Sequence, residues 1–398
     1  MRKKQKKNKN YLKKIPLSEP YLFGAEKKYV TECVETNWLA SGKYVDKFEN
    51  IIKDTTNSKF VLSSINGTSS LQLALRILDP KPGDEVLVPT ITFIAPINSV
   101  IYNFCAPVFF DCDENLNINT IDLINFIKFN TYYKNEFSYN KKTHKKIIAM
   151  IVVHVFGESV NLESQLIDLC KARNIKIIED AAESFGTFLK KDKNKTHTGT
   201  IGDIGCFSFN GNKIVTAGGG GALTFKNKAF YLRAKYLLNQ AKDDSDLFIH
   251  NDVGYNFRLS NLHAAIGFAQ IKNLKKILIK KKNIHNNYKK EINKISGLTI
   301  LESSKHSTSN YWLNTLIVDK KKYGLTKLEI IKKLKKHNIE TRSLWFPNHL
   351  QKPFKNYEKY KINKAQIFFE KSICLPSSYN LQDKDLKKIV NILEENKR

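Results

Sequence analysis

Short apolar runs alternate with longer segments of helical spacing between residues 58 and 225. The runs are rich in β-branched residues and comprise KFVLSSINGT, DEVLVPTITF, APVFFDCD, KIIAMIVVHVFG, NIKIIEDAAES and DIGCFSFN. Such near-continuous apolar character is typical of strands buried on both faces of a parallel sheet. Helical spacing occurs between and after the runs, at residues 69–78, 93–103, 162–173 and 228–239. Together these patterns predict an α/β domain with a mainly parallel sheet.

A different pattern begins near residue 259. Apolar residues recur three and four positions apart from Leu259 to Ile292, which predicts one long helix leading out of the sheet domain. A strand in NYWLNTLIVD and helices in LTKLEIIKKLKKHNI and DLKKIVNILEEN then predict a small α+β domain. The polar stretch 130–146 is expected to be an exposed loop or insertion. We therefore expect a basic tail (1–14), a large α/β domain (15–265), and a connecting helix with the small C-terminal domain (266–398).

The net charge of +28 raises the question of an anionic partner, nucleic acid or membrane. The lysines, however, are dispersed and accompany many Asn and Ile residues along most of the chain. Neither a zinc-finger spacing nor an RNA-binding aromatic signature accompanies them. We interpret the charge as a general compositional bias and expect no nucleic-acid partner, but a basic regulatory protein remains the alternative from another functional class.

Other features point to a globular enzyme. The N-terminal MRKKQKKNKNYLKK is basic and poor in apolar residues, which predicts a disordered or solvated tail without the apolar core of a secretory signal. No run of about 18 apolar residues suggests a membrane span. The six cysteines contain no CxxC pair, and most lie inside apolar runs, so buried thiols of a cytoplasmic enzyme are favoured over disulfides or a metal site.

Residues that could bind a ligand or take part in catalysis stand at the ends of three of the predicted strands. This is the edge at which open α/β sheets bind ligands. The first motif runs from Asn66 to Ser70 and places small residues and hydroxyls at the start of a predicted helix. Free N–H groups at a helix N-terminus favour an anion such as phosphate, although an ordinary N-cap has the same composition.

The second motif is the acidic pair Glu179 and Asp180, directly after the apolar run NIKII. Carboxylates at the end of a buried strand are costly to desolvate unless each has a partner. A cationic ring nitrogen would be one such partner for Asp180, and a metal or a buried salt bridge would be others.

The third motif, FSFNGNKIVTAGGGGALTF, contains Lys213 followed by four glycines. It is not a Walker A loop, because five residues separate Gly205 from Gly211, Asn212 precedes the lysine, and Ile214 replaces the hydroxyl residue. The glycines are better explained by tight turning next to a bulky ligand. A lysine partly desolvated between apolar strands favours Schiff-base chemistry, but a surface lysine has the same local sequence.

Taken jointly, the motifs are far more specific than any one of them. In order and spacing, NGTSSLQLAL, PTITFIA, IIEDAAESFG, GCFSFNGNK and GYNFRLSNLHAAIGFAQI resemble the DegT/DnrJ/EryC1/StrS family of pyridoxal-phosphate aminotransferases, which act on nucleotide-linked keto sugars. The resemblance extends from about Leu17 to about Leu393. It implies the type I, aspartate-aminotransferase-like fold, with a mainly parallel large domain and a small α+β C-terminal domain.

The resemblance also implies roles for individual residues. Lys213 would hold pyridoxal 5'-phosphate as a Schiff base and then move a proton between substrate and cofactor carbons. Asp180 would keep the pyridine nitrogen protonated. Some family members carry histidine at the lysine position and dehydrate sugars, so an intact Lys213 favours transamination.

Further cofactor contacts are implied in the same way. Glu183 would lie near the phenolic oxygen of the cofactor and the substrate, and Phe93 would lie against the ring. Asn256 would reach the phosphate of the neighbouring subunit's cofactor, which implies a homodimer with shared active sites. The phosphate-binding loops would include Gly67, Thr68, Ser69 and Ser208.

The substrate is narrowed by a finer resemblance. FSFNGNKI with its glycines, GYNFRL and IETRSLWFPNHLQ are most similar to the subgroup that aminates C4 of UDP-linked 4-keto-6-deoxy-N-acetylhexosamines, the bacillosamine and legionaminic acid type, with glutamate as the expected amino donor. Arg342, Trp345 and His349 would then lie near the sugar nucleotide, although packing between domains would explain them equally well. GDP-linked 4-keto sugars and 3-keto sugars are the alternative substrates.

Overall fold

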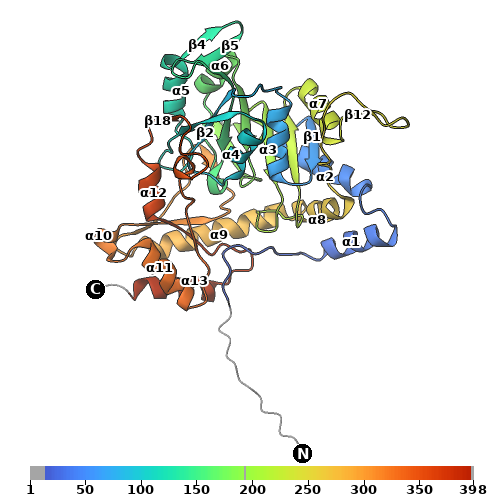
Figure 1. Ribbon diagram of the computed structural model, residues 1–398. Coiled ribbons are helices and arrows are strands. Elements are labelled where there is room, and N and C mark those ends of the chain that lie inside the picture. Colours follow the sequence, from blue (N-terminus) through green and yellow to red (C-terminus); the bar gives the residue numbers. More distant parts are fainter. Residues whose placement is uncertain (1–13, 192–193, 396–398) are drawn as a thin grey trace, which may run out of the picture.

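The computed structural model describes residues 14–191 and 194–395, which form a large domain and a smaller one beside it (Figure 1). The predicted basic tail therefore lies outside the described residues, apart from Lys14. Among the residues described, none of the helices has the length and apolar character needed to cross a bilayer.

The large domain is built on a ten-stranded sheet. Its main path runs in the order β1 (Phe60–Ser64), β11 (Gly221–Phe225), β10 (Ile204–Ser208), β7 (Lys176–Asp180), β6 (Lys146–Val153), β2 (Glu85–Pro89), β3 (Ala106–Phe110) and β18 (Lys359–Tyr360). From β10 to β18 every pairing on this path is parallel, whereas β11 is antiparallel to both of its neighbours. All six predicted apolar runs form strands of this sheet, which confirms the α/β fold class.

Helices on both faces explain why the strands read as continuous apolar runs. In β2, Val86 and Val88 belong to one buried apolar cluster and Leu87 belongs to another, so successive side chains enter different cores. The predicted helical stretches contain α3 (Gly67–Arg76), α4 (Ala95–Tyr102), α6 (Ser164–Ala172) and α7 (Lys228–Leu238). The large domain also contains α1 (Ala25–Glu35), α2 (Lys43–Thr56), α5 (Thr120–Phe129), β8 (Phe188–Lys191), β9 (Asn194–His197), β12 (Lys242–Asp244) and β13 (Ile249–His250).

The polar stretch 130–146 is not a loop. It forms a hairpin of β4 (Thr131–Lys134) and β5 (Phe137–Asn140), and β5 pairs antiparallel with β6, so the stretch extends the sheet. The turn is made by Asn135 and Glu136, both with positive φ. Tyr132 and Tyr139 stack across the pair, with ring centroids 5.4 Å apart, which stabilises a hairpin of low apolar content.

The single long helix expected after residue 259 is interrupted. The chain forms α8 (Asn261–Ile271) and α9 (Leu274–Ile292), with a break at Lys272 and Asn273. The Asn273 side chain donates a hydrogen bond to the carbonyl oxygen of Ala269 at 3.1 Å, which competes with continuation of the helix. Apolar periodicity continues across the break and therefore could not reveal it.

The small domain packs helices against a four-stranded antiparallel sheet. The sheet order is β14 (Leu298–Ile300), β16 (Asn314–Val318), β19 (Ser372–Leu375) and β17 (Arg342–Ser343). The helices are α10 (Lys320–Tyr323), α11 (Lys327–Lys336), α12 (Ala365–Lys371) and α13 (Asp383–Glu394), and β15 (Ser307–Thr308) pairs with β8. Helix α9 joins the domains, because Leu274 lies in the large-domain core and Ile284 in the small-domain core.

The N-terminal segment also belongs to the small-domain core. Ile15 is buried in that core, and its backbone exchanges 2.9 Å hydrogen bonds with Asn338 and Glu340. Nearby, the N–H of Ser377 donates to the carbonyl oxygen of Leu17 at 2.7 Å. The beginning of the described chain is thus tied to segments near its end, as Figure 1 shows.

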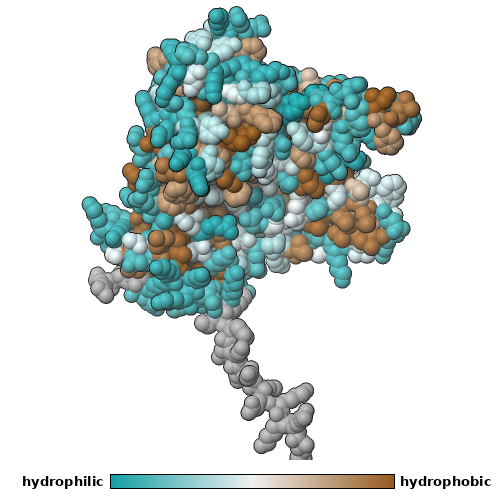
Figure 2. Space-filling view, in the orientation of Figure 1, coloured by the Kyte–Doolittle hydropathy of each residue, from teal (hydrophilic) through white to brown (hydrophobic). Residues whose placement is uncertain are grey.

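The surface is largely hydrophilic, with apolar colouring over α1 and over the projecting segment beyond β12 (Figure 2). Exposed apolar residues of these regions include Val34, Leu247 and Phe248. All six cysteines, in contrast, are buried free thiols, as predicted.

Candidate active site

One cavity of about 410 Å³ brings the three sequence motifs together. It lies at the carboxyl ends of β1, β7 and β10, the edge at which α/β sheets bind ligands. Of the predicted cofactor-binding residues, all except Asn256 line it: Gly67, Thr68, Ser69, Phe93, Asp180, Glu183, Ser208 and Lys213. Gly219 and Gly220, from the glycine run, line it as well.

One end of the cavity is the N-terminus of α3. Asn66 caps this helix, because its side-chain oxygen accepts the N–H of Ser69 at 2.8 Å. Gly67 lets Ser208 approach the helix, since a Cβ at position 67 would lie only 2.8 Å from the Ser208 Cβ. Hydroxyl groups and free N–H groups at this end fit a phosphate group.

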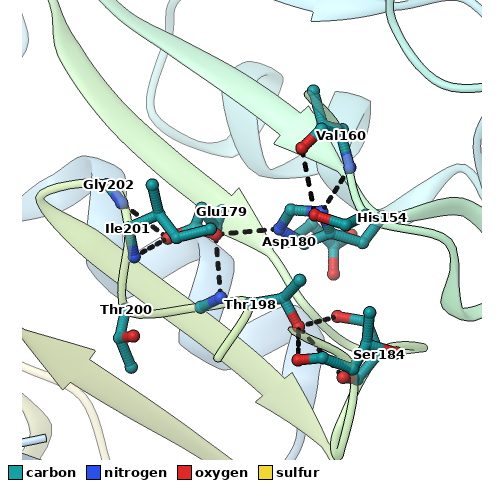
Figure 3. A network of polar contacts seen from close by, with 12 residues as sticks. His154, Val160, Glu179, Asp180, Ser184, Thr198, Thr200, Ile201 and Gly202 are labelled. Atoms are coloured by element: carbon teal, nitrogen blue, oxygen red, sulfur yellow. Dashed lines mark hydrogen bonds and ion pairs between the residues drawn. The ribbon is translucent and has the colours of Figure 1, made fainter. Parts of the chain in front are cut away.

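Glu179, the first member of the acidic pair, is fully buried and is not among the described residues that line the cavity; its carboxylate lies within a network of polar contacts (Figure 3). His154 Nε2 lies 2.9 Å from its carboxylate, and the N–H of Val160 donates to His154 Nδ1, which places the imidazole proton on Nε2. Burial works to raise the pKa of Glu179, but the hydrogen bonds outweigh it and hold that pKa below its ordinary value. The remaining donors to Glu179 are the backbone N–H groups of Gly199, Ile201 and Gly202.

Asp180, the second member, faces the cavity and is less completely paired. Its side chain is 5% exposed and accepts the N–H of Ala182 at 3.0 Å. Burial raises the pKa of Asp180, although the Ala182 hydrogen bond and the charge of Lys213 act in the opposite direction. A cationic ring nitrogen in the cavity would give this carboxylate the partner that Glu179 already has.

Lys213 is not a surface lysine, since its side chain is only 14% exposed. Its Nζ lies 3.5 Å from Glu183 Oε1 and 4.3 Å from the ring centroid of Trp312. The other Glu183 oxygen accepts the N–H of Phe156 at 2.8 Å. Burial raises the pKa of Glu183 to about 7, against the opposing effect of the Lys213 charge. The cavity therefore holds an amine beside a carboxyl group that titrates near neutral pH.

The loop after β2 supplies the opposite wall. Phe93 is 55% exposed and lies at the cavity, where its ring is accessible to a planar ligand. Beside it, Thr92 Oγ1 is buried and has no hydrogen-bond partner within the described ranges. A buried hydroxyl without a partner is rare, so it marks a place where a ligand atom would be accommodated. Nothing in the sequence distinguished Thr92 from its neighbours.

Four predicted site residues lie elsewhere. Asn256 is exposed and lines a separate cavity of about 630 Å³. Arg342 is exposed on β17. Trp345 packs against Phe156 in a tilted arrangement with ring centroids 4.6 Å apart, and the Nδ1 of the buried His349 lies 2.6 Å from Thr90 Oγ1. None of the four is among the described residues that line the Lys213 cavity.

Comparison with known proteins decides the family. A profile of the DegT/DnrJ/EryC1/StrS aminotransferase family matches residues 21–394. The chain belongs to this family. It is 34% identical over 387 residues to the putative pyridoxal phosphate-dependent aminotransferase EpsN of Bacillus subtilis, covering 96% of this chain and 95% of that protein. It is 33% identical to GDP-perosamine synthase of Escherichia coli O157:H7, covering 96% and 99% of the two chains.

Solved structures of other aminotransferases share the fold. PseC of Helicobacter pylori, an aminotransferase of pseudoaminic acid biosynthesis, has a TM-score of 0.85 at 22% identity, covering 96% of this chain and 99% of that one. The PLP-form of the putative sugar aminotransferase Spr1654 of Streptococcus pneumoniae has a TM-score of 0.84 at 23% identity, covering 96% and 98%. The type I aminotransferase fold is therefore established for this chain.

Pyridoxal 5'-phosphate is the cofactor of DegT/DnrJ/EryC1/StrS aminotransferases, and the residues of this chain fit it. Asp180 offers a buried carboxylate for the ring nitrogen, and Lys213 offers the amine. The α3 N-terminus and Ser208 offer phosphate donors at the other end of the same cavity. The cavity thus has complementary groups for the ring nitrogen, the aldehyde carbon and the phosphate of the cofactor.

Proposed function

We propose that this aminotransferase transfers an amino group from glutamate to C4 of a UDP-linked 4-keto-6-deoxy-N-acetylhexosamine, in a cytoplasmic step of surface-glycan biosynthesis. The observation that supports transamination most directly is the buried Lys213 amine, 3.5 Å from Glu183 in a cavity that also contains Asp180. The sugar assignment is supported by the motifs FSFNGNKI, GYNFRL and IETRSLWFPNHLQ.

The positions of the side chains in the cavity suggest a separate catalytic role for each. When bound, the cofactor supplies an electron sink for the carbon that loses its proton. Lys213 would hold the cofactor covalently, and its amine, once free, would carry a proton between the carbon of the amino donor and the cofactor carbon on the other side of the shared nitrogen. Asp180 would keep the pyridine nitrogen protonated, and Glu183 would balance the positive charge of Lys213.

A GDP-linked 4-keto hexose is the second candidate substrate. It is supported by the similarity to GDP-perosamine synthases over nearly the whole length of both chains, at 33% identity for Escherichia coli O157:H7 and 32% for Vibrio cholerae. A 3-keto sugar has narrower support, from a 3-aminotransferase of Acidithiobacillus ferrooxidans that is 33% identical over 52% of this chain. All three candidates require the same Lys213 chemistry.

The substrates are separated by offering the purified protein each keto-sugar nucleotide with glutamate and recording product masses. Amination of the UDP-linked 4-keto-N-acetyl sugar, with little turnover of the others, is the result expected. Turnover of the GDP-linked or 3-keto sugar alone would overturn the UDP assignment and leave transamination intact. A protein that stays colourless with added pyridoxal phosphate and is retained on DNA in a salt-sensitive manner would instead support the basic regulatory protein.

Glu183→Gln is expected to remove the acid side of the pH–activity profile. Burial raises the pKa of Glu183 to about 7, so its ionised form, which attracts the Lys213 ammonium, is lost as the pH falls through about 7. Glutamine is neutral at every pH, so the decline should be present in the wild type and absent from the variant. The measurement is kcat between about pH 5.5 and about pH 9. An acid limb that persists in the variant would assign this titration to another group.

We propose a homodimer with shared active sites. The basis is the position of Asn256, which lies outside the Lys213 cavity of its own chain. Exposed apolar residues such as Val34 and Phe248 offer surface for an interface. The expected mass in sedimentation is twice the 45.8 kDa of one chain. Mixing inactive Lys213→Ala and Asn256→Ala chains should restore activity, because each mixed dimer contains one site with neither change. No recovery after verified subunit exchange would mean that the site is not shared.

A further inference from the structure

Trp312 connects the small domain to the catalytic lysine. It lies just before β16 and is 3% exposed. Its ring centroid is 4.3 Å from Lys213 Nζ, and its indole N–H donates to the carbonyl oxygen of Asn212 at 2.7 Å. One side chain therefore contacts both the amine of Lys213 and the backbone of the preceding residue.

The position of Trp312 is fixed by its own backbone. Its N–H donates to Asn310 Oδ1 at 2.9 Å, and its carbonyl oxygen accepts a 3.0 Å hydrogen bond from Lys281 Nζ. Lys281 comes from α9, is 4% exposed, and also donates to the carbonyl oxygen of Ser377. Asn310 in turn donates to the carbonyl oxygen of Glu183 at 2.9 Å. The backbones of Trp312 and Glu183 are thus both hydrogen-bonded to Asn310.

These contacts leave the Lys213 amine between a carboxylate and an aromatic face. Glu183 Oε1 lies 3.5 Å away, and the indole ring is the nearest aromatic surface that the structure records for this amine. An indole face attracts a cation, and the attraction strengthens where water is excluded. Trp312 therefore attracts the ammonium group of Lys213 and limits where its Nζ can move.

We propose that Trp312 is a positioning residue for Lys213. Its ring holds the ammonium group beside Glu183 in the steps in which the lysine is not bonded to the cofactor, and its N–H fixes Asn212 so that the amine returns to the same place. This inference rests on the proposed role of Lys213 as the proton-transferring amine. No role for this tryptophan followed from the sequence motifs.

The first test measures the charge state of Lys213 directly. The protein is loaded with pyridoxamine phosphate, so that the lysine is not bonded, and is acetylated with acetic anhydride at about pH 7 and about pH 10. Peptide mass spectrometry gives the acetylation rate of Lys213 at each pH. The ratio of the two rates is compared between variants, because a change in the exposure of the lysine affects both rates and cancels in the ratio. In Trp312→Leu, the acetylation rate at the lower pH divided by that at the higher pH should rise about 5-fold, because the indole no longer attracts the charged amine. Trp312→Phe retains a ring face and should stay near the wild-type ratio, and the exposed Lys272 should not change in any variant.

The second test separates positioning from simple loss of folding. With α-deuterated glutamate, Trp312→Leu should increase the deuterium isotope effect on kcat, because proton transfer by a misplaced Lys213 becomes more rate-limiting. A purely structural role would lower the melting temperature and the activity together without changing the isotope effect. An unchanged acetylation ratio in Trp312→Leu would overturn the proposal, even if the sugar assay confirms transamination. Failure of the sugar assay would leave the acetylation result interpretable, so the two hypotheses fail separately.

Discussion

Lys213→Ala is expected to abolish transamination and to leave the purified protein colourless. The amine of Lys213 is the group in the cavity that can bond covalently to the cofactor, and the same amine moves the proton afterwards. Loss of both roles should lower kcat by about 10⁴-fold or more. The measurements are the visible absorption spectrum after loading with pyridoxal phosphate and the steady-state rate.

Lys213→Arg is the matched control, because it keeps the positive charge beside Glu183 and removes the nucleophilic amine. It should be as colourless and inactive as the alanine variant. A yellow, active arginine or alanine variant would show that a different lysine bonds to the cofactor. Melting temperatures near the wild-type value would exclude unfolding as the cause of inactivity.

Asp180→Asn is expected to have the second largest effect. Asparagine keeps the shape of the side chain and can still accept the N–H of Ala182 through its amide oxygen, but it carries no charge. Removing one member of a buried ion pair costs about 3–5 kcal/mol. If the loss falls on the transition state, kcat should decrease by about 10²- to 10⁴-fold. Cofactor should still bind through Lys213, so the variant should be coloured and slow, with kcat measured at saturating cofactor.

Asp113→Asn provides the comparison for Asp180→Asn. Asp113 is partly buried and accepts backbone N–H groups from Asn115 and Asn117 at 2.8 and 3.0 Å, but it does not line the Lys213 cavity. Its replacement should leave kcat close to the wild-type value. Equal losses in both variants would indicate a general effect of neutralising buried carboxylates, and full activity of Asp180→Asn would remove Asp180 from the mechanism.

The strands of the sheet were predictable because burial on both faces requires a continuous run of apolar residues within each strand. Every residue of β2 is buried, and after Glu85 its sequence is apolar without alternation; β3 is buried and apolar throughout. The motifs of the site were predictable for a related reason. Asn66 and Lys213 follow β1 and β10, and Asp180 is the last residue of β7. Strands that end at one edge of a sheet bring the residues at and beyond their ends together.

What the sequence could not reveal depends on contacts between distant segments. The helix break at Asn273 depends on one side-chain hydrogen bond within an unbroken apolar periodicity. Trp312 contacts Asn212 across 100 positions, and its apolar neighbours predict an ordinary strand residue. His154 reaches Glu179 from the next strand of the sheet, a pairing that only the strand order determines. The buried hydroxyl of Thr92 has no hydrogen-bond partner among the described residues, and a sequence pattern does not show such an absence.

The N-terminal segment has a consequence for the order in which the enzyme is completed during synthesis. Ser18 donates its hydroxyl to the carbonyl oxygen of Asn212 at 3.1 Å, next to the catalytic lysine. Two residues before Ser18, the carbonyl oxygen of Pro16 accepts a hydrogen bond from the hydroxyl of Ser378, 362 positions later, so this segment leaves the ribosome long before its partners exist. The loop that carries Lys213 can therefore reach its final set of hydrogen bonds only after nearly the whole chain has been translated. A nascent chain with a finished sheet would still lack a finished active site.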